Sequence, residues 1–281
     1  MRRTSNRVDE RLTLTSGFTL VELVVVITII SILAAAVTLF FRNPIQSFID
    51  SENRSNLTDR ADSALRRMSR DIANALPNSV RVATNGNDQF IEFVPISSAG
   101  RYRASVGTSA TDDPLDFNAS PIDHSFDVLG PSISVAAGDM LVIYNLGLSG
   151  ATVYDGSNIR PLSVTGSLNN LTFTGNNFPF SSPSNRFQTV STAETFACDM
   201  TNKLLLRYSG YAIPTSGQPS SIATLNGLAT ARQLASNLSG CKILYIPGAL
   251  QRNGLLTVYL TLTQNGETVT LMHQMNVANS P

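Results

Sequence analysis

Glu22 places a carboxylate at the start of a long apolar run, SGFTLVELVVVITIISILAAAVTLFFRNP, which covers residues 16 to 44. From Leu23 to Phe41 no residue is ionisable. A carboxylate within hydrocarbon costs roughly 2.5 to 3.5 kcal/mol at mid-membrane, less near an end, and usually has a partner. In the simpler alternative, an acid in the first helical turn gains about 0.3 to 1 kcal/mol from the helix dipole alone. The chemistry at Glu22 is therefore electrostatic.

The apolar run is long enough to cross a membrane. Residues 18 to 41 would form a helix about 36 Å long, against roughly 30 Å of hydrocarbon. Four arginines precede it, so the positive-inside rule keeps the N-terminus in the cytoplasm and the body is exported; they are Arg2, Arg3, Arg7 and Arg11. A secretory signal peptide cleaved near Ala36 is the alternative. It does not explain why the apolar run continues to Phe41.

The heptapeptide GFTLVEL, residues 17 to 23, resembles the cleavage and methylation motif of type IV prepilins and type II secretion pseudopilins. The resemblance implies that prepilin peptidase cuts after Gly17, removes residues 1–17 as a leader and methylates the amine of Phe18. Glu22 then becomes the fifth residue of the mature chain. Its implied partner is the free terminal amine of a neighbouring subunit, within an assembly of minor and major pilins.

The resemblance also implies where the chain resides. Before assembly the apolar segment lies in the inner membrane and the body in the periplasm, and after assembly the subunit is part of a fibre at the cell surface. The leader is longer than many in the family and contains the acids Asp9 and Glu10.

A second helical pattern follows the apolar run. From Ile45 to Leu76, apolar residues recur in steps of three and four, and Pro77 ends the pattern. Pro44 removes a backbone donor and is the expected kink. We therefore expect a transmembrane segment at 18–43, an amphipathic helix at 44–76 and a β-rich body at 77–281.

The fold class expected is α+β, with the long helix packed on a mainly antiparallel sheet. Asn-Gly pairs predict hairpins at Asn85 and at Asn265, and a third hairpin joins ETFACD to KLLLRYS. Residues 228–240 are expected to form a short helix. The segments 96–131 and 147–184 are rich in Gly, Ser, Asn, Asp and Pro, so we expect long surface excursions there.

Catalysis by this chain is not expected. His124 and His273 are the only histidines, and neither accompanies a nucleophile motif; His273 is expected to be a hydrogen-bonded core residue. Calcium binding is conceivable at an acidic cluster, but a solvated loop is favoured because the spacing does not match an EF-hand. The cluster comprises Asp112, Asp113, Asp116, Asp123 and Asp127.

Other ligands are also disfavoured. No motif for a cofactor is present, and the formal net charge of zero, with scattered arginines, argues against nucleic acid. The cysteines Cys198 and Cys241 can form a disulfide if the body lies outside the cytoplasm. Two thiols and two distant histidines are too few ligands for a metal site.

Two further stretches, ALPNSVRV at 75–82 and the C-terminal region from Ser239 onward, resemble the MshO-type minor pilins of the mannose-sensitive haemagglutinin (MSHA) pilus. That wider family includes the PilW-like minor pilins and the J-type pseudopilins. The resemblance implies a low-abundance subunit that primes the fibre and stays at or near its tip. Since the acid is retained at Glu22, the subunit is expected below another one.

Three other functions compete with a minor pilin. One is a pseudopilin of a type II secretion system, and another is a periplasmic enzyme with a signal peptide. The third is a tip adhesin that binds a surface glycan through loops 96–190, with exposed aromatic rings stacking on sugar. The candidate rings are Tyr102, Phe117, Phe178 and Phe180.

Overall fold

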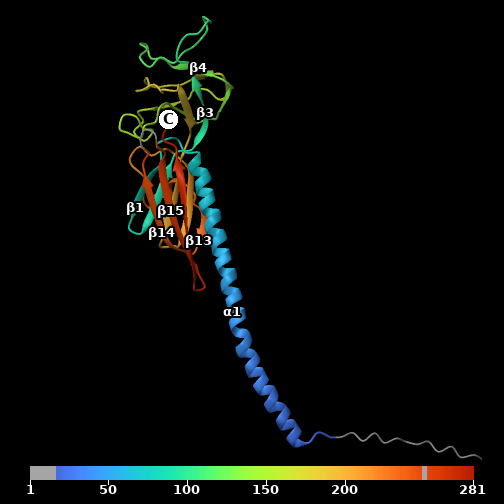
Figure 1. Ribbon diagram of the computed structural model, residues 1–281. Coiled ribbons are helices and arrows are strands. Elements are labelled where there is room, and N and C mark those ends of the chain that lie inside the picture. The colour runs from blue at the N-terminus through green and yellow to red at the C-terminus, as the bar shows by residue number, and fades with distance from the viewer. Residues whose placement is uncertain (1–16, 249–251) are drawn as a thin grey trace, which may run out of the picture. The chain divides into compact units, whose positions relative to one another are not determined.

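The computed structural model describes residues 17–248 and 252–281 (Figure 1). The chain divides into two compact units, Met1–Glu52 and Asn53–Pro281. Helix α1, Leu20–Ala73, begins in the first unit and ends in the second. It is unbroken at Pro44, so the proline does not end the helix, and the kink expected there stays a prediction. The helix stops three residues before Leu76, whose N–H donates to the carbonyl of Val94 at 2.8 Å.

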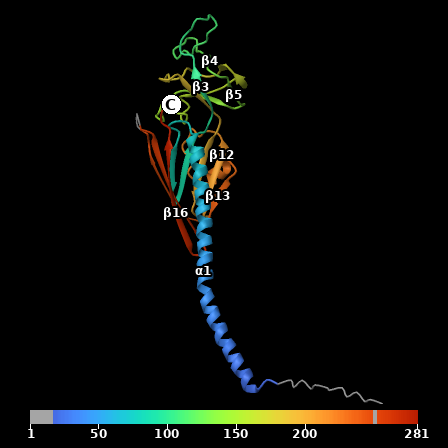
Figure 2. The same ribbon diagram turned by 45° about the vertical axis from the view of Figure 1, so that its right-hand side comes forward.

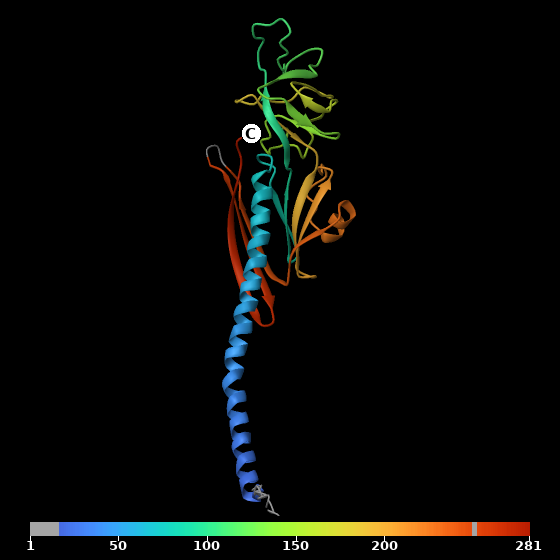
Figure 3. The same ribbon diagram turned by 90° about the vertical axis from the view of Figure 1, so that its right-hand side faces the viewer.

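Two antiparallel sheets form the core of the second unit. The first has the order β1-β2-β11-β12-β13, with bounds Arg81–Asn85, Asp88–Phe93, Ala193–Asp199, Leu204–Tyr211 and Arg232–Ser236. The second has the order β14-β15-β16, with bounds Leu238–Ile246, Gly254–Gln264 and Glu267–Val277. The C-terminal part of α1 runs between them (Figure 3). The expected α+β class is confirmed.

The helix joins the sheets because one of its faces is apolar. Its buried residues follow the helical period: Leu57, Ala61, Ala64, Leu65, Met68 and Ile72. They share one core with Phe93 and Phe196 of the first sheet and with Leu256 and Leu260 of the second. The disulfide between Cys198 and Cys241 links β11 to β14, and its Cα atoms lie 6.4 Å apart. The predicted pairing of these cysteines is confirmed.

A third sheet lies beyond the C-terminal end of α1 (Figure 2). Its order is β7-β6-β10-β3-β4-β9, with bounds Ile159–Pro161, Met140–Val142, Arg186–Val190, Ile96–Tyr102, Ser125–Leu129 and Asn170–Thr172. The pair β5, Ile133–Val135, and β8, Gly166–Leu168, accompanies it. Tyr102, Phe126 and Phe187 are among its core residues. The long surface excursions expected at 96–131 and 147–184 are therefore replaced by short strands in part, while residues 103–124 contain no strand.

The helix expected at 228–240 was also wrong. Helix α2 is Ile222–Leu228, and the hydroxyl of Ser221 caps it by accepting from the N–H of Thr224. The chain then forms β13, because pairing with β12 decides its conformation more than local propensity does. The hairpins at Asn85 and Asn265 and the one joining β11 to β12 are confirmed.

Candidate functional site

The first turn of α1 is closed by a side-chain cap that links Thr19 to Glu22. The N–H of Glu22 donates to Oγ1 of Thr19 at 3.2 Å, and the N–H of Leu23 donates to the Thr19 carbonyl at 3.2 Å. A threonine cap with glutamate three residues later is the sequence signature of a capping box. This T-x-x-E signature was not predicted from the sequence, and only its threonine half is formed here, with the backbone N–H of Glu22 as the donor.

The carboxylate of Glu22 is exposed and accepts no hydrogen bond and forms no ion pair within the part of the chain that the structure describes. A glutamate at this position completes the first turn through its own backbone and keeps its charge available. The arrangement therefore fits a carboxylate whose partner is supplied by another molecule.

The helix that follows has an apolar surface with no protein covering it. Leu20–Thr38 has a mean hydropathy of 2.8 and none of it is buried. At 1.5 Å per residue this segment is about 28 Å long, which matches a bilayer core. Val21 is 70% exposed and Ile32 is 68% exposed. Such a surface is stable only in lipid or against other apolar helices.

The hydroxyl groups within this apolar segment are satisfied by the helix itself. Thr28 donates to the carbonyl of Val25 at 2.8 Å, and Ser31 donates to that of Ile27 at 2.7 Å. Thr38 donates to the carbonyl of Ala34. Since their donors are paired internally, these side chains add little to the cost of placing the helix in lipid.

Gly17 and Phe18 lie just before the cap and are exposed. The Phe18 side chain is 76% exposed. A Cβ atom added at Gly17 would meet no atom within 4 Å. The fold itself therefore does not require glycine at this position.

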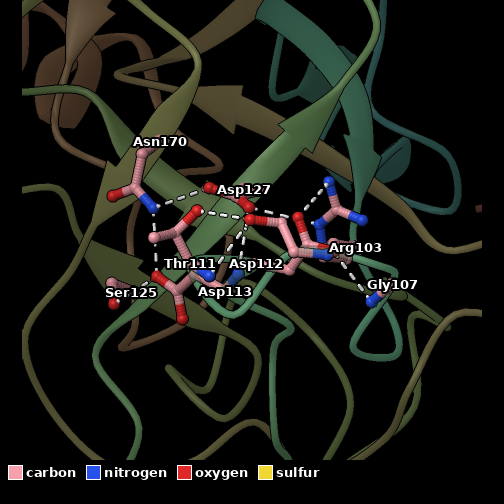
Figure 4. A network of polar contacts seen from close by, with 9 residues as sticks. Arg103, Gly107, Thr111, Asp112, Asp113, Ser125, Asp127 and Asn170 are labelled. Carbon is pink, nitrogen blue, oxygen red and sulfur yellow. Dashed lines mark hydrogen bonds and ion pairs between the residues drawn. The ribbon is translucent and has the colours of Figure 1, made fainter.

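The acidic cluster is held together by protein donors (Figure 4). Arg103 forms ion pairs with Asp112 and Asp127, each at 3.2 Å. Asn170 donates to Asp113 at 3.0 Å and to Asp127 at 3.2 Å. The hydrogen bond from the backbone of Asp113 lowers the pKa of Asp127 below its usual value, and Asn170 adds to this effect.

Asp116 and Asp123 stabilise the same loops by accepting hydrogen bonds from backbone N–H groups. Asp123 accepts from the N–H of Asp116 at 2.8 Å, and Asp116 accepts from the N–H of Asn118 at 2.8 Å. Within the described residues, no three His, Cys, Asp or Glu side chains converge as a metal site. The carboxylates organise the loops between β3 and β4.

The proposed aromatic and histidine positions are only partly where sequence reasoning placed them. Tyr102 and Phe178 are 1% and 3% exposed, so they were wrongly expected at the surface. Phe117 is half-buried against Tyr102, and Phe180 is 51% exposed. His273 is half-buried rather than in the core, beside Arg66 and Arg70. His124 packs edge-on against Phe173.

Two buried ionic groups were not found from the sequence. Arg207 bridges Asp71 of α1 and Glu194 of β11, at 3.1 and 2.8 Å. Arg67, four residues before Asp71 on the helix, also pairs with Asp71 at 2.9 Å and joins this network. Burial raises the pKa of Glu194, and Arg207 offsets part of that rise. Only the folded pairing of distant strands brings these residues together.

The second buried group surrounds Glu92, whose side chain is fully buried. It forms an ion pair with Arg81 and accepts from the hydroxyl of Tyr211 at 2.9 Å. The guanidinium of Arg81 also stacks on the ring of Tyr154, 3.6 Å from its centroid. Burial raises the pKa of Glu92, with the two hydrogen bonds acting in the opposite direction.

Comparison with known families matches residues 14–38 to the prokaryotic N-terminal methylation motif. The match covers Gly17, Phe18, Thr19, Glu22 and the exposed apolar helix. The chain is type IV pilin-like. Proteins with this motif are structural rather than enzymatic, and the motif implies processing by prepilin peptidase and assembly with other pilins. It fits anchoring of the pilin-like chain in a membrane before assembly.

No curated protein and no solved structure matches the chain.

Proposed function

We propose that this pilin-like chain is a minor pilin of an MSHA-type pilus, related to MshO, which helps to initiate assembly and remains at or near the fibre tip. The observation that carries the proposal is the exposed, capped apolar helix that presents Glu22 five residues after Gly17. The proposed cleavage lies between Gly17 and Phe18, with methylation of the Phe18 amine. The body then resides in the periplasm until assembly.

The size of the folded body supports a place at the tip. Asn53–Pro281 forms one compact unit that includes a third sheet with a core of its own. A repeating shaft subunit with so large a body would pack less easily around a thin fibre than a subunit at its end. Retention of Glu22 supports a position below another subunit, whose terminal amine would meet this carboxylate.

The mass of the mature N-terminal peptide tests the processing step. We expect it to begin with methylated Phe18 and to include Glu22. The Gly17→Ala variant should keep its leader while the body folds normally, because a Cβ atom at Gly17 meets nothing within 4 Å. A mature terminus near Val37 would instead indicate an ordinary signal peptide and would overturn the proposal.

Two variants, one at Glu22 and one at Thr19, separate the role of the charge in assembly from the role of the helix cap. Glu22→Gln keeps a residue that suits a capping box but removes the charge. Thr19→Ala removes the cap and keeps the charge, at a typical cost of about 1 kcal/mol to the helix. We expect Glu22→Gln to be processed but to lose association with partner pilins and piliation, whereas Thr19→Ala retains both. Normal assembly of Glu22→Gln would contradict the proposed role.

A pseudopilin of a type II secretion system is the second candidate, because the matched motif is shared by both systems. Deleting the coding region distinguishes them. Loss of pili with normal protein secretion supports the minor pilin, and loss of secretion with normal pili supports the pseudopilin.

A further inference from the structure

The last strand of the body has one unpaired edge. β16 is at the end of its sheet and pairs only with β15. The eleven-residue ladder between them has no register shift, and β16 contains no proline. No backbone hydrogen bond joins its other side to a described segment. A long, regular edge of this kind is suited to accept a further strand.

The turn before β16 determines which groups face outward. Asn265 and Gly266 have φ values of 53° and 85°, as in a two-residue type I′ turn, and Gln264 lies opposite Glu267. In such a hairpin this flanking pair is hydrogen-bonded, and bonded and non-bonded pairs then alternate. The N–H and C=O groups of Thr268, Thr270 and Met272 therefore point away from β15.

An open groove lies between this strand and α1. Arg66, Ser69, Arg70 and His273 line it, and its volume is about 310 Å³. The inward-facing Val269 and Leu271 are only half-buried, whereas Met275 and Val277 further along β16 are 3% and 1% exposed. The core is thus incompletely covered beside the free edge of the strand.

The charge of the groove selects the kind of partner. Arg66 is 71% exposed and pairs with Asp62. Arg70 is exposed and forms no ion pair within the described residues, while Asp71 is directed to Arg67 and Arg207. A positive charge therefore remains unbalanced at the rim, and acidic side chains complement it.

We propose that the groove receives an extended acidic segment of a neighbouring pilin-like subunit. The segment adds a strand to the free edge of β16 through backbone hydrogen bonds and turns carboxylates toward Arg66 and Arg70. The identity of this partner as a pilin-like subunit rests on the proposed function above.

Hydrogen exchange of the full chain tests the added strand. In the complex isolated with its partner pilins, we expect the outward amides of Thr268, Thr270 and Met272 to exchange at least tenfold more slowly than in the free chain. Equal exchange within an intact complex overturns the inference alone. If no complex with partner pilins forms, the proposed function fails. A direct peptide probe then tests whether β16 accepts an added strand.

The direct probe is a ten-residue peptide of alternating Asp and Val, compared with one of alternating Lys and Val. With the full chain in detergent micelles, we expect the Asp peptide to bind at least tenfold more tightly and to protect the same amides. The double variant Arg66→Glu, Arg70→Glu should abolish this preference, with Arg60→Glu on the same helix as the control. Equal affinities, protection elsewhere, or protection caused by a second copy of the chain overturns the proposal.

Discussion

The guanidinium of Arg207 in β12 lies 3.1 Å from the carboxylate of Asp71 in the last turn of α1. It also lies 2.8 Å from Glu194 in β11, and all three side chains are at most 18% exposed. This contact fixes the end of the long helix against the first sheet. Removing Arg207 leaves the largely buried carboxylate of Glu194 without an ion-pair partner, whereas Asp71 keeps its pair with Arg67.

The Arg207→Ala variant should therefore lower the free energy of unfolding by about 3 kcal/mol. Urea unfolding of the full chain in detergent measures the effect. The matched control is Arg66→Ala, which breaks a pair with Asp62 whose side chains are 71% and 45% exposed. That variant should cost less than about 1 kcal/mol. Equal effects of the two changes would show that Arg207 does not hold the helix.

Glu92 should make the free energy of unfolding of the body depend on pH. Burial raises its pKa above the usual 4.5, so the folded state keeps a proton that the unfolded state has lost. The stability that this group contributes is full below pH 4.5 and is lost as the pH rises through the folded pKa.

Urea unfolding at several pH values above and below the usual Glu pKa compares the native chain with Glu92→Gln. We expect the stability difference between native chain and variant to fall as the pH rises, because glutamine does not titrate. A difference that grows with pH would mean that the ion pair with Arg81 outweighs burial.

The disulfide between Cys198 and Cys241 should stabilise the body by closing the second sheet over the helix. Its cysteines are 43 residues apart in sequence, and a loop of that length corresponds to about 4 kcal/mol of chain entropy. The double variant Cys198→Ala, Cys241→Ala should lose most of this stabilisation. Urea unfolding with a reducing agent provides the check: the agent should weaken the native chain and leave the double variant unchanged.

Calcium should have no stabilising effect at the acidic loops, because Arg103, Asn170, the Ser125 hydroxyl and backbone N–H groups already occupy their carboxylates. Addition of calcium or a chelator should move the melting temperature by less than about 1 °C. A calcium-dependent rise that disappears in Asp113→Asn would contradict this expectation. Asp88→Asn, which alters an acid outside the cluster, is the control.

Sequence reasoning succeeded where the signal is local. The Asn265 and Gly266 turn sets the register of the last hairpin, and the apolar steps from Leu57 to Ile72 give the buried face of the helix. The acid at Glu22 identified the N-terminal segment, although its cap by Thr19 was missed. A search for T-x-x-E before an apolar run would have found it.

Sequence reasoning failed where strands that are far apart in the sequence pair with each other. β3 pairs with β10, so that Gly100 lies opposite Phe187. A Cβ atom at Gly100 would come within 2.7 Å of that ring. Close packing therefore explains the glycine at this strand position, which in the sequence alone suggests a loop. The strands of the third sheet are three to seven residues long, too short to show a periodicity of their own.

The apolar face from Leu57 to Ile72 is synthesised early, yet much of its cover, β15 and β16, comes some two hundred residues later in the sequence. Until β15 and β16 are synthesised, this stretch lacks their cover. A chain that lacks the last hairpin therefore leaves part of this apolar face open to water, so packing of α1 on the body requires synthesis of nearly the whole sequence.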